Sequence, residues 1–175
     1  MSRDERKGHA ALRRGRFSIV GASYFLTLCT EHRCPGLTTS ILAEAVIREV
    51  EILADDDVWR LQALTIMPDH VHVLVALGAK LDLSPAISRF KAKTKGALQS
   101  GNLHWERGYF DHRIRPDDKL APVLRYMALN PFRAGLTKST EQVWPWFRLG
   151  EVESNWFRPG FPDDDESTHP AWLKK

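Results

Sequence analysis

Cysteine is scarce in this 175-residue chain, because only Cys29 and Cys34 are present, too few for a disulfide framework. Their spacing matches no zinc-binding signature, so we interpret both as incidental. No apolar run approaches the roughly 20 residues that cross a bilayer. The first residues are charged where a secretory signal would need an apolar core, so we do not expect export. These absences predict a cytoplasmic protein.

The remaining composition is that of a folded domain. Hydrophobic residues make up 43% of the chain, which is enough for a real core. The length suits one domain with short tails. We expect a basic flexible arm over residues 1–16, a folded domain over 17–150, and an acidic tail over 151–175 that contains the acidic run 163–166.

The positive charge of the chain is clustered. The net charge is +3, but most cations gather in the first 16 residues and between residues 89 and 115. Such clusters are typical of proteins that bind a polyanion, most often nucleic acid, although a solvated charged face is the alternative. The candidate DNA contacts are Arg13, Arg14, Arg16, Arg89, Lys91, Lys93, Lys95, Arg107, Arg113 and Arg115.

The predicted elements follow the order strand, helix, strand, strand, helix, strand, helix. Apolar residues at a period of two predict the strands, and those at a period of 3.6 predict the helices. We expect Ser84 to cap the second helix and Pro85 to lie in its first turn. Pro131 is expected to end the third helix, since proline disfavours helical backbone before it. The predicted ranges are 24–30, 41–54, 58–67, 70–77, 84–100, the end of 105–115, and 117–130.

The first six elements form a βαββαβ pattern. This pattern predicts an α+β fold of the ferredoxin-like type, an antiparallel sheet with two helices on one face. The third helix is an addition. It is free to cover the other face of the sheet.

The strand that contains His70 and His72 has two different faces. Its aliphatic row should face the two helices, which leaves both imidazoles on the opposite face. Neutral imidazoles two residues apart suit a shared divalent cation. The alternative is that both histidines belong to the solvent-facing row of a half-buried strand. The aliphatic row is Val71, Val73, Val75 and Leu77.

Tyr126 and Asn130 lie four residues apart on the third predicted helix, so they share a face. If that face lies opposite His70 and His72, two imidazoles, one amide and one phenol converge. A divalent cation held there would polarise a phosphate, and the phenol would attack it to form a covalent phosphotyrosine. The alternatives are core packing for Tyr126 and a helix-terminal position for Asn130.

Two separated motifs, the segments 67–75 and 126–136, together resemble the HUH single-tyrosine transposases. The resemblance is strongest to the branch of REP-associated tyrosine transposases, which belongs to the IS200-like transposases. It extends over roughly residues 16–150, the segment expected to be the catalytic domain. The turn 105–109 is part of it.

The resemblance implies a metal-dependent single-stranded DNA endonuclease and strand transferase that acts near palindromic hairpins. Tyr126 resembles the nucleophile, which keeps the 5′-phosphate and frees a 3′-hydroxyl. His70, His72 and Asn130 resemble the ligands of Mg²⁺ or Mn²⁺. The basic segments would follow DNA phosphates, and Trp105, Tyr109 and His112 are candidates to stack on unpaired bases, with core packing as the alternative for Trp105. The REP-associated branch resembles monomers, whereas insertion-sequence relatives work as dimers, so the resemblance favours a monomer over a homodimer.

Some residues depart from the family pattern, and other functions stay open. Asp69 stands where the family motif usually has asparagine, which places a negative charge near the metal or exchanges one turn residue for another. Tyr109 is a rival nucleophile, but no helical oxygen ligand follows it four residues later.

Two other functions stay open for the chain. A non-catalytic module that binds hairpin DNA or RNA is one alternative, and a metal-dependent hydrolase without a covalent step is another.

Overall fold

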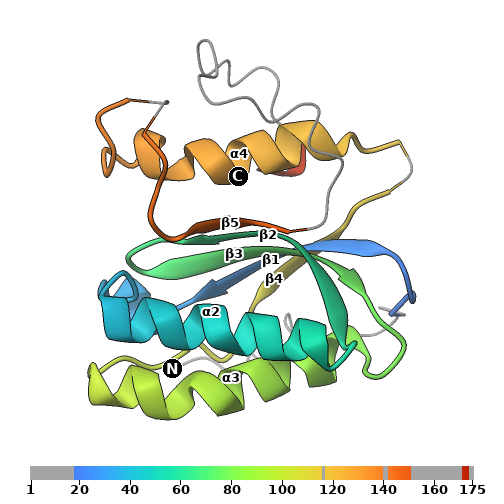
Figure 1. Ribbon diagram of the computed structural model, residues 1–175, viewed down its shortest axis with the longest axis horizontal. Coiled ribbons are helices and arrows are strands. Elements are labelled where there is room, and N and C mark those ends of the chain that lie inside the picture. Colours follow the sequence, from blue (N-terminus) through green and yellow to red (C-terminus); the bar gives the residue numbers. More distant parts are fainter. Residues whose placement is uncertain (1–17, 116, 140–141, 151–170, 174–175) are drawn as a thin grey trace, which may run out of the picture.

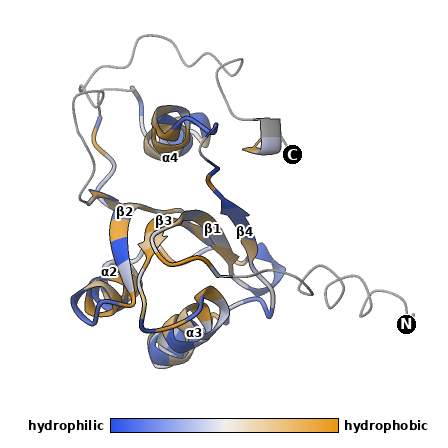
Figure 2. Cartoon of the chain, turned by 90° about the vertical axis from the view of Figure 1, so that its right-hand side faces the viewer, coloured by the Kyte–Doolittle hydropathy of each residue, from blue (hydrophilic) through white to orange (hydrophobic). Residues whose placement is uncertain are grey.

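The computed structural model describes residues 18–115, 117–139, 142–150 and 171–173. A five-stranded antiparallel sheet has the strand order β4-β1-β3-β2-β5. Helices α2 and α3 cover one face, and α4 lies on the other (Figures 1 and 2). The elements are β1 (Ser23–Cys29), η1 (Glu31–Arg33), α2 (Ser40–Asp55), β2 (Trp59–Ile66), β3 (His70–Leu77), α3 (Leu83–Ser100), β4 (Phe110–Arg113), α4 (Leu120–Arg133), β5 (Phe147–Leu149) and η4 (Ala171–Leu173).

The predicted α+β, ferredoxin-like arrangement is confirmed. The aliphatic row of β3 is buried in the larger core, between the sheet and the helices α2 and α3. Leu74 points to the other face and packs with Phe25 and Met127 beneath α4. The predicted arm over residues 1–16 and all but residues 171–173 of the predicted tail lie outside the described residues.

Two predicted helix starts are wrong. Helix α3 begins at Leu83, and Asp82 occupies the N-cap position that we assigned to Ser84. The Leu83 side chain is buried, and its backbone N–H donates to Ser18 Oγ at 3.0 Å, so the cap and the first helical residue lie two residues earlier than predicted. Helix α4 starts at Leu120 rather than at residue 117. Asp118 instead accepts a hydrogen bond from Arg115 N at 2.8 Å, which closes a turn before the helix.

Helix α4 also continues through Pro131, where we expected it to end. A proline inside a helix has no N–H for the carbonyl four residues earlier, which here is that of Met127. The Thr65 hydroxyl of β2 donates to this carbonyl, with 2.9 Å between the oxygens. Because the sheet replaces the missing donor, the helix extends to Arg133.

The sequence pattern did not predict strand β5. It predicted only aromatic packing after residue 143. Strand β5 is the edge strand beside β2 and pairs with it through the partners Ala63 and Leu149 and the partners Thr65 and Phe147. Trp144 Nε1 also donates to Ile66 O at 2.8 Å. Three residues are too few for a period of two to be recognised.

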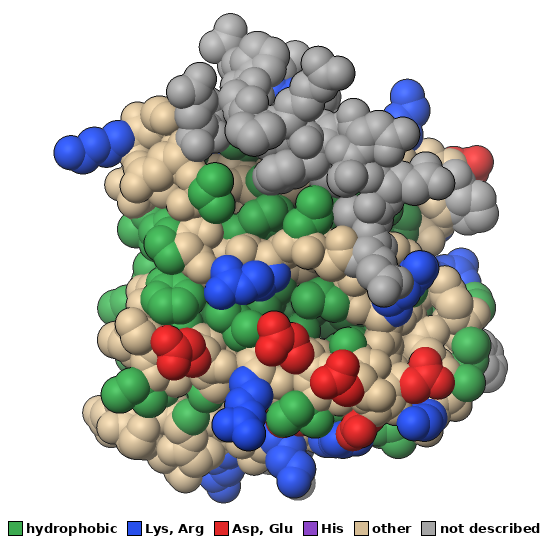
Figure 3. All heavy atoms as spheres, in the orientation of Figure 1, with side chains coloured by type: hydrophobic (Ala, Val, Ile, Leu, Met, Phe, Trp, Pro, Cys, Tyr) green, Lys and Arg blue, Asp and Glu red, His purple; other side chains and the backbone are tan. Residues whose placement is uncertain are grey.

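The face of the molecule on which α2 lies carries a row of acidic side chains. Lysines and arginines lie below this row and also above it (Figure 3). The exposed acids of α2 include Glu44, Glu51 and Asp55. This row would repel a polyanion. Among the described residues, no helix has the length and apolarity required to cross a membrane.

Candidate active site

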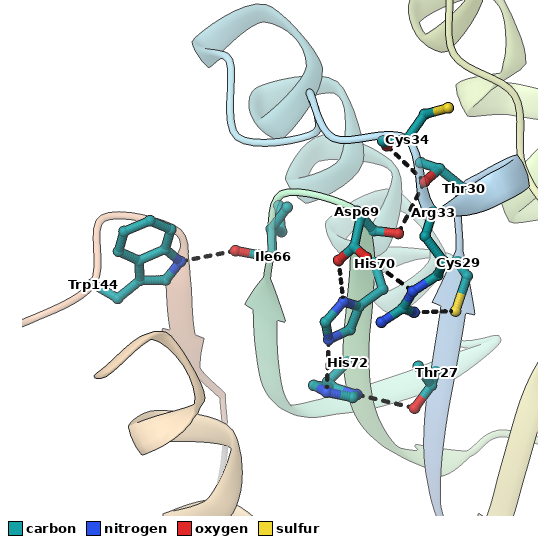
Figure 4. A network of polar contacts seen from close by, with 10 residues as sticks. All are labelled: Thr27, Cys29, Thr30, Arg33, Cys34, Ile66, Asp69, His70, His72 and Trp144. Carbon is teal, nitrogen blue, oxygen red and sulfur yellow. Dashed lines mark hydrogen bonds and ion pairs between the residues drawn. The ribbon is translucent and has the colours of Figure 1, made fainter. Parts of the chain in front are cut away.

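His70 and His72 lie side by side on β3, on the sheet face that carries α4 (Figure 4). Their Nε2 atoms face each other at 3.1 Å. The remaining nitrogen of each ring has a partner of its own. His70 Nδ1 lies 2.6 Å from Asp69 Oδ1, and His72 Nδ1 lies 3.0 Å from Thr27 Oγ1. These contacts fix both rings so that their Nε2 atoms point at a common position.

Burial keeps both imidazoles in the neutral form that binds metals. The pKa of His70 is lowered by burial, and the hydrogen bond from its ring to Asp69 opposes this effect only in part. Burial lowers the pKa of His72 well below its ordinary value, and the neighbouring His70 adds to the effect. Because the Asp69 carboxylate accepts the Nδ1 proton of His70, the His70 Nε2 keeps its lone pair.

Asp69 is held in place by two neighbours. Arg33 Nε lies 2.8 Å from Asp69 Oδ2, and the Thr30 hydroxyl donates to the Asp69 backbone carbonyl at 3.0 Å. Figure 4 shows this chain from Arg33 through Asp69 to His70 and His72. The sequence did not single out Thr27 or Arg33. The pairing of Thr27 with His72 across β1 and β3 follows from strand register, which the sequence pattern did not specify.

Tyr126 projects from α4 toward the imidazole pair. Its ring centroid lies 5.5 Å from that of His72, with the ring planes at 61°. Phe25 packs against both rings, at 5.1 Å from His72 and 6.2 Å from Tyr126. The Arg133 guanidinium lies 5.3 Å from the centroid of the Tyr126 ring. The structure therefore brings the predicted nucleophile and the two predicted imidazole ligands together.

Asn130 lies one turn after Tyr126 and is half-buried. Within the described part of the chain, no hydrogen bond joins its amide to either imidazole, so its role as a third ligand stays a prediction. No cluster of three or more His, Cys, Asp or Glu side chains able to hold a metal occurs among the described residues. Among those residues, a third protein ligand at the imidazole pair would come from another residue type, such as an amide.

The family model for IS200-like transposases matches residues 18–128, which include β1, both histidines and Tyr126. The chain belongs to the IS200-like transposase family.

A protein of Haemophilus influenzae named as a REP-associated tyrosine transposase is 26% identical to this family member over 145 residues. The alignment covers 72% of this chain and 78% of that protein. The fold is also similar to the structure of a REP-associated tyrosine transposase bound to a REP hairpin, with a TM-score of 0.66. That likeness covers 89% of this chain and 94% of the other, at 23% sequence identity, and it shows the fold.

The candidate DNA contacts of this transposase that the structure describes lie on different elements. Arg13, Arg14 and Arg16 lie outside the described residues. Arg89 forms an ion pair with Asp56, and Lys91 donates to the carbonyls of Glu106 and Gly108. Both cations therefore have structural partners. Lys93 and Lys95 are exposed on α3, across the sheet from α4, whereas Arg107, Arg113 and Arg115 are exposed on β4 and its flanks.

The three predicted base-stacking residues have intramolecular partners. Trp105 packs on Phe90 and the helix-side core. Lys91 lies over the ring of Tyr109, with its Nζ 5.8 Å from the centroid. The His112 ring is stacked on Trp172 at 3.8 Å and 13°. Trp105 is half-buried, so part of its ring packs on the core and part lies at the surface.

Proposed function

We propose that the chain is a metal-dependent endonuclease and strand transferase that cuts single-stranded DNA beside palindromic hairpins and forms a 5′-phosphotyrosine at Tyr126. The observation that carries this proposal is the convergence of one phenol and two facing imidazole nitrogens on one sheet face. Membership of a transposase family supports DNA as the substrate. The similar structure with a REP hairpin supports a hairpin as the feature recognised.

The imidazole pair fits a divalent cation such as Mg²⁺ or Mn²⁺. Two ligands at right angles, each about 2.1 Å from one ion, are separated by about 3 Å, close to the distance between the Nε2 atoms. Burial lowers the pKa of both rings, which favours their neutral form, and their outer nitrogens are anchored. His70, His72 and the Asn130 amide oxygen would hold the ion. Once bound, it would polarise the scissile phosphate and stabilise the charge that develops there.

The chain's own residues supply the covalent step. The Tyr126 hydroxyl loses its proton as its oxygen attacks the phosphorus, and the bond from phosphorus to the 3′-oxygen breaks. The leaving strand takes up a proton and ends in a 3′-hydroxyl. Attack by a 3′-hydroxyl on the phosphotyrosine reverses the step and joins the strands. The Arg133 cation beside the phenol ring would stabilise the negative charge that develops in the transition state.

The decisive experiment incubates the protein with end-labelled hairpin DNA carrying single-stranded flanks, with the sequence taken from the genomic flanks of its gene. With Mn²⁺ or Mg²⁺ present, we expect a covalent protein–DNA adduct that Tyr126→Phe abolishes. Chelation of the metal should also abolish it. Size-exclusion chromatography of the complex tests the expected monomer.

Two results would favour the alternatives. Cleavage that survives Tyr126→Phe would assign the chemistry to a metal-activated water, as in a hydrolase. Hairpin binding without cleavage under either metal would favour a non-catalytic binding module. In that case the two histidines would have no catalytic role.

A further inference from the structure

A cavity of about 290 Å³ lies between α3 and the segment 103–107 that precedes β4. It is in the helix layer, on the other side of the sheet from α4. Its apolar lining comes from Leu98, Leu103 and the Trp105 ring. Pockets for small ligands begin at about 300 Å³, so this one suits a single small planar group.

The walls of the cavity are held by hydrogen bonds. Trp105 Nε1 donates to Thr94 Oγ1 at 2.8 Å, which fixes the plane of the indole. Lys91 Nζ donates to the carbonyls of Glu106 and Gly108 at 2.7 and 2.6 Å, and so ties the segment to α3. The cavity is therefore formed before any ligand arrives.

The segment 103–107 is also hydrogen-bonded to the end of β1, the strand that lies beside the imidazole pair. Glu106 N donates to Cys29 O at 2.8 Å, and Cys29 pairs with His70 across β1 and β3. Glu31 N donates to His104 O at 2.8 Å, just beyond the end of β1. The cavity is thus built onto the sheet end from which His70 projects.

The chemistry of the rim suits a nucleotide. Lys95 and Arg107 are exposed cations that line the cavity, and cations there attract the phosphates next to a base. The indole offers a stacking surface. Exposed carboxylates of Glu31 and Glu106 also line it. Carboxylates accept hydrogen bonds from exocyclic amino groups, which adenine, cytosine and guanine carry and thymine lacks.

We propose that this cavity holds one unpaired base of the DNA substrate, turned out of the strand, and that it selects a base with an exocyclic amino group. This inference rests on the proposed function for the identity of the ligand. It adds a site of base recognition separate from Tyr126.

The test measures hairpin affinity by fluorescence anisotropy, with Tyr126→Phe protein in chelator so that no strand is cut. Each unpaired nucleotide of the flanks is replaced in turn by an abasic site. We expect one position at which the abasic site weakens binding by about 5- to 100-fold, the range for one stacked base. Thymine at that position should weaken binding as well.

A protein variant then assigns that position to the cavity. Ala92→Phe fills the cavity from an exposed helix position, so it should weaken binding of the intact hairpin without unfolding the protein. In this variant the abasic site should have no further effect, since the two changes remove the same interaction. Ser84→Phe, exposed on the same helix about 12 Å away along its axis, is the matched control and should bind like the parent protein.

The proposal is overturned if no unpaired position is sensitive, or if the sensitivity persists unchanged in Ala92→Phe. Equal binding of all four bases at the sensitive position would overturn the selection of amino-bearing bases. Adduct formation by the wild-type protein is measured separately and does not require base selection. If only the cavity proposal is wrong, the wild-type protein still forms the adduct. If the catalytic proposal is wrong, it forms no adduct, so the two failures are distinguishable.

Discussion

The hydroxyl of Thr65 donates a hydrogen bond to the carbonyl of Met127 across 62 residues of sequence. Pro131 leaves that carbonyl without its helical donor, and Thr65 is itself the cross-strand partner of His72. The residue next to Met127 is Tyr126. One side chain of the sheet therefore anchors the tyrosine helix directly above the imidazole pair.

Removing this anchor should slow the reaction at Tyr126. Thr65→Val keeps the shape but leaves a buried carbonyl without a partner, which costs about 1–3 kcal/mol of stability. We expect slower single-turnover adduct formation with little change in hairpin affinity. Thr65→Ser retains the donor and should recover most of the rate. Equal adduct rates for Thr65→Val and the wild type would remove Thr65 from any positioning role.

Asp69 should control the affinity for the metal. Its carboxylate orients His70 and increases the electron density on the ring. Asp69→Asn keeps an oxygen acceptor but loses the charge and the ion pair with Arg33, so we expect about 10-fold weaker Mn²⁺ binding, measured by calorimetry. Asp69→Ala should weaken it further. Unchanged Mn²⁺ affinity in both variants would mean that Asp69 serves only the turn.

Arg133 should assist the attack by Tyr126. Its guanidinium lies against the phenol ring, where a positive charge stabilises the negative charge of the transition state. Arg133→Gln is expected to reduce the adduct rate roughly 10-fold, in the range of a single catalytic contribution. Arg125→Gln removes the same charge from the residue before Tyr126 and serves as the control. Similar losses in both variants would point to a general loss of positive charge rather than to a specific effect at the phenol.

Glu49 should make stability depend on pH. Its side chain is 7% exposed, Oε1 has no hydrogen-bond partner, and burial raises its pKa despite Arg89 and Lys93 nearby. Because the folded state then holds its proton more tightly, stability is greatest below the ordinary carboxyl pKa and falls as the pH rises through the raised value.

Glu49→Gln removes this titration. The variant should therefore match the wild type near pH 4 and exceed it near pH 7, by an amount of the order of 1 kcal/mol. Urea midpoints at the two pH values measure the difference, and titrations elsewhere cancel between the two proteins. A constant difference between pH 4 and pH 7 would contradict the raised pKa.

The sequence determined those features that depend on local spacing. A period of two on β3 placed His70 and His72 on one face and the aliphatic row on the other. A period of 3.6 identified the buried stripe of α2, which includes Leu42 and Val46. The antiparallel βαββαβ arrangement followed from the order of these elements.

Only the tertiary structure decided the contacts between distant segments. Thr27 reaches His72 across 45 residues, and Thr65 reaches Met127 across 62. Both contacts depend on strand register and on where α4 docks, and a local pattern specifies neither. The same reason explains why Pro131 does not end α4, because the donor that replaces its missing N–H comes from another strand. The sequence thus supplied the reactive groups, and packing of the sheet against α4 set the distances between them.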